Sequence, residues 1–319
     1  MHESINTTRG KFFLTNLSQL RNDIRQYAGP DTVINVMSID LEEWFQVTNF
    51  ENVISRSGWN QCLSRTQEVM PRLLDLFSEH RVRATFFTLG WIAERYPELI
   101  RRISKEGHEI ASHGYDHRLV TTMTRDEFRQ QLIQSKDILE QILGEAIYGY
   151  RAPTYSFRKE THWVIEELLD TGFLFDSSIF PHGKRDNPEL CDSKFPCYLS
   201  GKGKQLAEYP LSIFNFYGME IPIAGGGYFR LLPYMFVKQM IERLNQKDKL
   251  AIMYFHPWEF DPEQPKVASA PMLSKFRHYV NLKQNEDKLK CLVRDFRFAS
   301  FKDIFWDENK RKYNISTQI

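Results

Sequence analysis

Two short motifs hold carboxylates and imidazoles at spacings that suit a metal-dependent hydrolase. The first, SIDLEEWF, places Asp40 and Glu42 one residue apart at the end of an apolar run. Residues two apart on a strand face the same side, so one carboxylate can bind a metal while the other accepts a proton. The second, HGYDH, places His113 and His117 four residues apart, which on a helix or tight loop brings both imidazoles to one side. Two histidines and one carboxylate leave a tetrahedral Zn²⁺ one open position for water.

Each motif also has a purely structural explanation. The carboxylates could form an exposed acidic strand end, and a pair of histidines at this spacing is more often found on a surface or in a core. Two further residues end predicted strands. Arg151, in GYRAPTYSF, could keep a catalytic carboxylate ionised and oriented, or form a surface ion pair. His256, in MYFHPWEF, could protonate a leaving amine, or be a core histidine.

The elements that must position these residues alternate between short apolar runs and amphipathic stretches. Strands are predicted at residues 32–40, 83–90, 108–113, 146–151, 173–178, 250–256 and 296–300. Helices are predicted at residues 64–81, 91–107, 124–144, 159–172 and 234–246, and an irregular stretch at 180–205. This alternation predicts a mainly parallel sheet with helices outside, as a barrel or an open sheet. In both, polar residues at the carboxyl ends of strands converge.

Composition narrows the class of protein. The 319 residues are 42% hydrophobic and 26% charged, with a net charge of +1, which is ordinary for a globular protein and gives no sign of nucleic-acid binding. The polar start holds no signal-peptide core and no window is apolar enough for a membrane span, so we expect a cytoplasmic protein. Four cysteines are too few for a disulfide framework. We expect free thiols, including Cys191 and Cys197, with a metal or redox pair there as the lesser alternative.

Taken in order, the motifs resemble the polysaccharide deacetylase family, whose catalytic module is the NodB homology domain. They are most similar to the subgroup found in bacterial exopolysaccharide gene clusters linked to exosortase systems. The similarity covers most of residues 35–265, through the phrases SIDLEEWFQV, RATFFTLGWIAERYPELI, GHEIASHGYDHRLV, YRAPTYSF, FDSSIFP, IPIAGGGYFRLLPY and FHPWEFDPEQP. It implies a distorted (β/α) barrel at residues 31–265, a polar segment at 1–30, and an extension at 266–319 packed on the barrel.

The resemblance also implies a divalent metal, foremost Zn²⁺, with Co²⁺, Ni²⁺, Mn²⁺ or Fe²⁺ as alternatives. Asp40 takes the role of the base, His256 that of the general acid, and Arg151 that of the residue orienting the base. The implied metal ligands are Glu42, His113 and His117. The family's usual first motif has adjacent aspartates, and here the intervening residue leaves Glu43 as a rival ligand to Glu42.

The remaining motif residues are assigned to substrate and oxyanion contacts. Pro153 stiffens its loop, so that the backbone N–H of Thr154 could face a developing oxyanion. Thr154 replaces the family's usual aromatic residue, and Tyr155 could supply the missing ring. Asp176 matches the fourth motif of the family.

The expected reaction is hydrolysis of an N-acetyl group from an amino sugar, with water deprotonated by Asp40 and acetate released. The substrate would be a bacterial surface polysaccharide or its precursor, as polymer, lipid-linked intermediate or nucleotide sugar, and an exopolysaccharide synthesis complex is a possible partner. A second hypothesis is a hydrolase of cyclic imides or ureides, because such relatives share the Asp-x-Glu spacing. A third is a non-catalytic glycan-binding module, which would lack the base or the acid. No oligomeric state is predicted.

Overall fold

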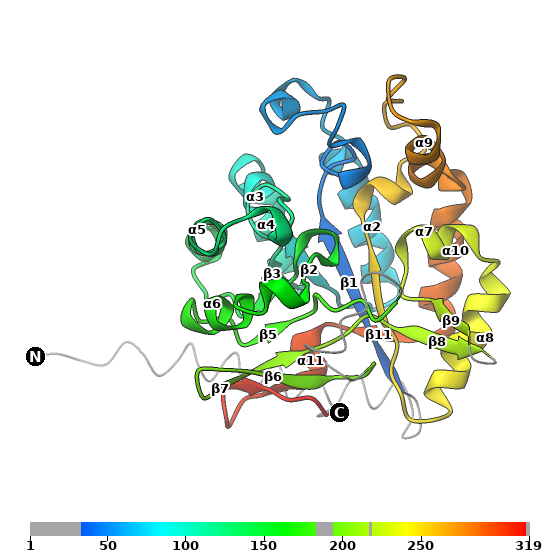
Figure 1. The fold of residues 1–319 in the computed structure, drawn as a ribbon. Helices are drawn as coiled ribbons and strands as arrows, with labels where there is room; N and C mark the ends of the chain where they lie inside the picture. Colours follow the sequence, from blue (N-terminus) through cyan, green and yellow to red (C-terminus); the bar gives the residue numbers. More distant parts are fainter. Residues whose placement is uncertain (1–32, 183–193, 217–218, 317–319) are drawn as a thin grey trace, which may run out of the picture.

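The protein folds around one mainly parallel sheet, seen in a computed structural model that describes residues 33–182, 194–216 and 219–316. The strand order is β10-β1-β2-β3-β4-β5-β7-β6, and β11 also pairs with β1 (Figure 1). The strands are β1 (Ile34–Leu41), β2 (Thr85–Thr88), β3 (Glu109–Ser112), β4 (Gly149–Tyr150), β5 (Phe175–Asp176), β6 (Cys197–Gly201), β7 (Lys204–Glu208), β10 (Ile252–Phe255) and β11 (Arg297–Ala299). The predicted parallel sheet is confirmed.

The sheet bends into a distorted barrel because the chain after β7 crosses towards β10. The amide of Ile252 donates to Oγ of Ser212 over 2.8 Å. A parallel bridge also joins Gly225 to Tyr254, whose amide donates to the carbonyl of Ala224 over 2.6 Å. A Cβ atom on Gly225 would lie 1.8 Å from the Tyr254 carbonyl oxygen, so only glycine permits this approach. The glycines of IAGGGYF therefore help to close the barrel.

Alternation along β1 decides which side chains face the barrel interior. Met37, Ile39 and Leu41 belong to the core between the sheet and its helices. Val36 belongs instead to a second core inside the barrel, as does Phe87 of β2. Because side chains alternate along a strand, Asp40 points inward like Val36, at the carboxyl end where chemistry was expected.

The predicted helices are present with one correction, and residues 226–231 form a helix, α7, that was not predicted. They are α2 (Thr66–Glu79), α3 (Gly90–Arg95), α4 (Pro97–Lys105), α5 (Arg125–Leu143), α6 (Val164–Asp170), α7 (Gly226–Leu231) and α8 (Tyr234–Asn245). The single helix predicted at residues 91–107 is wrong: it is α3 and α4, separated at Tyr96. Pro97 is the reason, because its ring disfavours helical geometry in the preceding residue, and Tyr96 has φ −129° and ψ 55°.

Within the predicted irregular stretch at residues 180–205, the part described after residue 193 contains regular structure that was not predicted. Residues 197–201 form β6, which pairs antiparallel with β7 from residue 204. The two-residue turn at Lys202 and Gly203 takes positive φ values of 49° and 73°, as hairpin turns require. The expectation of a free thiol at Cys197 is wrong, since this residue is disulfide-bonded. Cys62 and Cys291 are free, and Cys191 lies outside the described residues.

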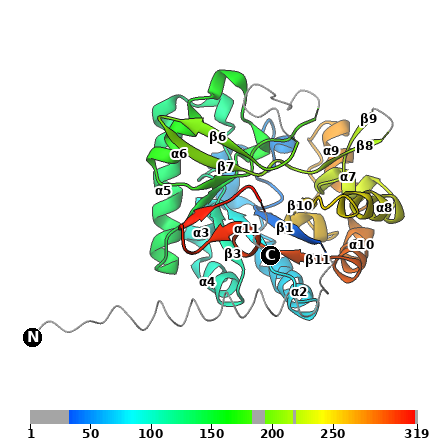
Figure 2. The same ribbon diagram turned by 90° about the horizontal axis from the view of Figure 1, so that it is seen from below.

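The C-terminal part of the chain packs on the side of the barrel near β10 and across its lower end. Helices α9 (Met272–Tyr279) and α10 (Leu282–Asp295) lie on the side of β10, and β11 joins β1. Helix α11 (Phe301–Phe305) lies across the lower end of the barrel, where Phe301 and Phe305 enter the inner core (Figure 2). The predicted strand at residues 296–300 is confirmed as β11. Within the described part of the chain, no helix combines the length and apolarity needed to cross a bilayer.

Candidate active site

Three buried side chains form a potential metal centre at the carboxyl ends of β1 and β3. One ligand atom each of Glu42, His113 and His117 lies within 4.8 Å of the other two. Oε2 of Glu42 lies 2.9 Å from Nε2 of His117. Nδ1 of His113 lies 2.8 Å from the carbonyl oxygen of Arg151, which can only accept, so Nδ1 carries the proton and Nε2 keeps its lone pair. The three residues fit a divalent cation of the zinc type.

The loop that carries both histidines owes its shape to unusual backbone angles. After β3 the chain turns at Gly114, with φ 75°, and at His117, with φ 56°. The side chain of Arg56 donates to the carbonyls of Asp116 and His117 over 2.9 and 3.2 Å. The His-x₃-His pair therefore lies on a braced tight loop, which is one of the two geometries that the spacing allowed.

Electrostatics in this centre favour an ionised carboxylate and neutral imidazole. Burial raises the pKa of Glu42, but the opposing effect of His117 and then His256 is greater and lowers it to about 2. Burial lowers the pKa of His113 to about 4. Both groups are thus in the protonation state that metal binding requires at neutral pH.

Glu43, the rival ligand, points into a different environment. Its carboxylate accepts a hydrogen bond from Ser64 and the backbone amides of Arg65 and Thr66, the latter two over 3.0 and 3.2 Å. These are the amides at the start of α2, which otherwise have no partner within the helix. Glu43 therefore holds the N-terminus of α2, and burial raises its pKa.

Asp40 forms a buried ion pair with Arg151 beside the potential metal centre. Nη1 of Arg151 lies 2.7 Å from Oδ1 of Asp40 and donates also to Ser38 over 2.8 Å. The other guanidinium nitrogens donate to the carbonyl and hydroxyl oxygens of Ser177, at 3.0 and 2.8 Å. This fixes one oxygen of Asp40 and leaves Oδ2 directed at the cavity, 3.4 Å from the hydroxyl of Tyr155.

The turn after β4 has a strained backbone at two successive residues. Pro153 begins a short 3-10 turn, and Thr154 and Tyr155 have φ values of 56° and 54°. Such angles are costly for residues other than glycine and concentrate at functional sites. The Tyr155 amide donates to Ala152 over 3.0 Å, whereas no described residue accepts from the Thr154 amide. The Thr154 hydroxyl lies 2.7 Å from that of Thr48.

His256 follows β10, and its imidazole lies near the carboxylates of Asp40 and Glu42. Its Nε2 lies 3.5 Å from Glu42 Oε1 and 3.9 Å from Asp40 Oδ2, and its Nδ1 lies 3.6 Å from Glu259 Oε1. Burial lowers the pKa of His256, but the neighbouring carboxylates, Glu42 foremost, raise it to about 9. The imidazolium form is therefore present at neutral pH and can donate a proton.

Asp176 lies behind the site instead of in it. It ends β5 opposite Glu208 of β7, and its carboxylate accepts from the hydroxyl and amide of Ser178 at 2.6 and 3.2 Å. Burial raises the pKa of Asp176 to about 6 and that of Glu208 well above its ordinary value. Asp176, Arg151 and Pro153 do not line the cavity described next.

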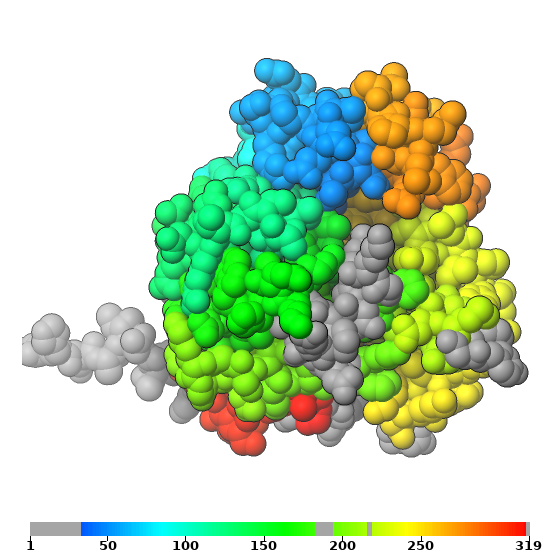
Figure 3. Space-filling model, viewed as in Figure 1, coloured from blue at the N-terminus to red at the C-terminus, as the bar shows by residue number. Residues whose placement is uncertain are grey.

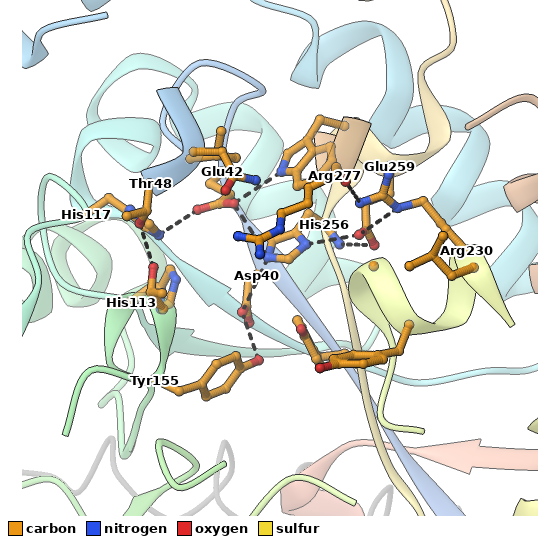
Figure 4. A pocket seen from close by; sticks show the side chains of 18 residues that line it. Asp40, Glu42, Thr48, His113, His117, Tyr155, Arg230, His256, Glu259 and Arg277 are labelled. Carbon is orange, nitrogen blue, oxygen red and sulfur yellow. Dashed lines mark hydrogen bonds and ion pairs between the residues drawn. The ribbon is translucent and has the colours of Figure 1, made fainter. Parts of the chain in front are cut away.

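A cavity of about 430 Å³ opens above these groups and is of a size that holds small ligands. In Figure 4, Asp40, Glu42, His113, His117 and His256 converge at its base. Its other walls are Val47, Thr48, Asn49, Thr154, Tyr155, Gly227, Tyr228, Arg230, Leu231, Tyr254, Trp258, Glu259 and Arg277. In Figure 3, the blue lobe before α2 and the orange lobe containing α9 stand side by side above the barrel, with a depression beneath them.

Several of these lining residues were not found by sequence reasoning. Trp258 donates from Nε1 to Glu42 Oε1 over 3.1 Å, and Glu259 supports both His256 and Arg230. Glu259 had a local signal, because a glutamate three residues after His256 can form a capping box. Arg230 and Arg277 had none, since each reaches the site only through the packing of α7 and α9.

Comparisons with known proteins relate parts of the chain to two described families. Residues 57–170 match the family described as polysaccharide deacetylase, and residues 177–306 match a family described as a domain of unknown function, DUF3473. A peptidoglycan-N-acetylglucosamine deacetylase of Bacillus cereus is 41% identical over 86 residues, which are 27% of this chain and 31% of the relative. The chain thus spans under a third of the length of this curated relative. The resemblance to polysaccharide deacetylases is confirmed.

Two solved structures share the fold. One, from Mycobacterium smegmatis and named as a candidate polysaccharide deacetylase, superposes with a TM-score of 0.54 at 21% identity, over 83% of this chain and 87% of that one. The other, Puue allantoinase, has a TM-score of 0.50 at 17% identity over the same shares. The predicted distorted (β/α) barrel is confirmed. Because both kinds of protein have it, the barrel alone does not choose between their reactions.

Proposed function

Because this chain carries a polysaccharide deacetylase domain, we propose that it is a metal-dependent hydrolase that removes the acetyl group from an N-acetylated amino sugar. The observation that carries the proposal is the convergence of three parts in one cavity. These are a base paired with an arginine, a buried Glu-His-His cluster, and a histidine that is protonated at neutral pH. A non-catalytic module would have no need of the first and third parts.

A divalent metal, foremost Zn²⁺, held by Glu42, His113 and His117, would act as a Lewis acid on water and on the acetyl carbonyl. The residues of the chain supply the proton transfers. Asp40 accepts the proton of the attacking water at Oδ2, because its other oxygen is held by Arg151. The Thr154 amide is the proposed donor to the developing oxyanion.

His256 then donates its proton to the departing amine. Glu259 lies near its second ring nitrogen and keeps Nε2 directed at the reacting atoms. The products are acetate and a free amino sugar. The cavity has flat apolar surfaces, from the rings of Tyr228 and Tyr254, and polar groups, from the hydroxyls of Thr48 and Thr154. A sugar requires this mixture of surfaces.

The natural substrate that we propose is a bacterial surface polysaccharide or its precursor, as the exopolysaccharide-type motifs indicate. The cytoplasmic location expected from the sequence stays a prediction. The disulfide at Cys197 speaks against it, because such bonds are rare in reducing compartments and common in oxidising ones.

The deciding experiment measures acetate release from N-acetylated oligosaccharides by chelated protein, by protein reloaded with Zn²⁺, and by the variants His113→Ala and Asp40→Asn. We expect release only with metal and a loss of roughly 10²–10⁴-fold in Asp40→Asn, the usual contribution of a general base. Full activity of Asp40→Asn would exclude it as the base. Turnover of cyclic imides or ureides, with no acetate from any glycan, would replace the proposal by the amidohydrolase alternative.

A further inference from the structure

The cavity contains one cationic side chain that the reaction does not use. Arg277, near the end of α9, lines the cavity, and Figure 4 draws its guanidinium reaching over His256 and Glu42. Among the described residues, no hydrogen bond or ion pair is formed by its side chain. Its guanidinium is therefore available to a ligand that enters the cavity.

The carboxylates of the cavity are already matched by other positive groups. Asp40 pairs with Arg151 at 2.7 Å, and Glu259 pairs with Arg230 at 3.3 Å. Glu42 belongs to the potential metal centre, where a divalent cation would outweigh its single negative charge. Arg277 is therefore a surplus cation, and the entrance to the cavity favours a negatively charged ligand.

A buried arginine fixes the backbone that carries this surplus cation. Arg230 is only 2% exposed, and its guanidinium donates to the backbone carbonyls of Arg277, His278 and Val280 at 3.0, 2.7 and 3.1 Å. These carbonyls lie at the C-terminal end of α9, where a helix leaves acceptors without partners and favours a cation. Because Arg230 also pairs with Glu259, it ties the backbone at Arg277 to the segment that carries His256.

We propose that Arg277 is a specificity-determining residue that binds an anionic group of the substrate next to the reacting N-acetyl sugar. The inference rests on the proposed deacetylase function and adds the substrate class: an amino sugar beside a carboxylate or a phosphate. Guanidinium groups bind both anions through paired hydrogen bonds. A uronic acid in the polymer would supply the carboxylate, and a phosphodiester or nucleotide sugar would supply the phosphate.

The test compares acetate release from three probes. They are a neutral chitooligosaccharide, an oligosaccharide of alternating N-acetylglucosamine and glucuronic acid, and a uridine diphosphate N-acetyl sugar. Wild-type protein is expected to prefer one anionic probe, and the preferred probe identifies the source of the charge. Arg277→Gln should lower kcat/KM for that probe by about 10-fold, mainly through KM, and leave the neutral probe unchanged. Arg277→Lys should recover part of the loss.

Lys266→Gln is the matched control, because it removes an exposed positive charge from the same lobe without touching the cavity. Equal losses on neutral and anionic probes in Arg277→Gln, or no loss at all, would overturn the inference. If no probe releases acetate, the proposed function fails, and a binding measurement then tests the anion site by itself. Titration calorimetry of the glucuronic acid probe and the nucleotide sugar against chelated protein should show at least one of them binding about 10-fold more weakly to Arg277→Gln than to wild type. Equal affinities for both would reject the anion site.

Discussion

At the scale of single residues, adjacent glutamates in one motif have unrelated tasks. Glu42 faces two histidines across the base of a cavity, whereas Glu43 accepts hydrogen bonds at the start of α2. The difference follows from strand alternation, because consecutive side chains at the end of β1 point to opposite faces. The sequence-based preference for Glu42 over Glu43 as the metal ligand rested on this argument, and the assignment stays a prediction until metal binding is measured.

Substituting each glutamate separately tests the assignment. Glu42→Gln should weaken Zn²⁺ binding more than about 100-fold and change stability little, because a neutral amide is a poor ligand. Glu43→Gln should retain wild-type Zn²⁺ affinity but lose about 1–2 kcal/mol of stability, since a charge-assisted helix cap is removed. Calorimetric titration of chelated protein and urea unfolding measure the two effects. If Glu43→Gln lost Zn²⁺ affinity and Glu42→Gln lost stability, Glu43 would be the ligand instead.

The buried pair behind the site predicts a pH-dependent stability. Because burial raises the pKa of Asp176 to about 6 and that of Glu208 well above its ordinary value, the folded state holds protons that the unfolded state releases near pH 4. Stability from this pair is thus full below about pH 4 and is lost as the pH rises through 6. Glu208→Gln should flatten the fall in Tm between pH 4 and 8.

Glu167→Gln provides the contrast for this experiment. Burial opposes ionisation of Glu167, but Arg129 and Arg125 outweigh it and lower its pKa. Its contribution is therefore present above about pH 4.5 and lost on acidification. Removing Glu167 should cost stability at neutral pH and little at low pH. A Glu208→Gln protein whose Tm profile is parallel to that of the wild type would contradict the raised pKa values of this pair.

At the scale of elements, the approach of the segment before α7 to β10 brings Arg230 and Tyr228 to the cavity. This approach depends on Gly225, whose φ of 137° and close contact with Tyr254 exclude a side chain. Two elements far apart in sequence thus meet because one of them has no Cβ atom. The glycines of the motif IAGGGYF therefore have a structural role, whereas Tyr228 and Arg230, which follow them, line the cavity.

Alanine at Gly225 should destabilise the protein by about 2–4 kcal/mol, because the backbone oxygen of Tyr254 must move. Gly144→Ala is the matched control. Gly144 caps α5 with φ 70° and has no atom within 4 Å of a built Cβ, so only the backbone angle is strained and about 1 kcal/mol should be lost. Denaturant unfolding measures both. Equal losses of stability in the two variants would show that the close contact between Gly225 and β10 adds little to the cost of the backbone angle.

At the scale of the whole molecule, the potential metal centre joins segments that are distant along the chain. Glu42 follows β1, and His113 and His117 follow β3, while Trp258 after β10 holds the carboxylate from the far side. A ligand that binds only the folded state stabilises it by mass action. The centre therefore couples metal binding to the stability of the barrel.

Zn²⁺ at a hundred times its Kd should stabilise chelated protein by about 2.7 kcal/mol, seen as a rise in Tm. The same addition to His113→Ala should give little or no rise, because one of three ligands is missing. His162→Ala, which changes an exposed histidine that is not part of the cluster, should respond like the wild type. A rise in Tm that survives in His113→Ala would mean that the cation binds elsewhere.

Much of this architecture follows from local sequence patterns. Short apolar runs and amphipathic stretches indicated the strands and most helices, and the polar residues after those strands indicated where chemistry would lie. The prediction failed at residues 91–107, where Pro97 divides a helix. It also failed at residues 197–205, where a polar hairpin has little apolar periodicity.

The sequence by itself determined which residues can act as base, acid and metal ligands, because residue type and position after a strand limit their chemistry. Only the tertiary structure decided which of them meet. It leaves Asp176 outside the cavity and brings Arg230 and Arg277 to it. The physical reason is that the positions of Arg230 and Arg277 depend on how α7 and α9 pack against the barrel, and no local spacing along the chain records that packing.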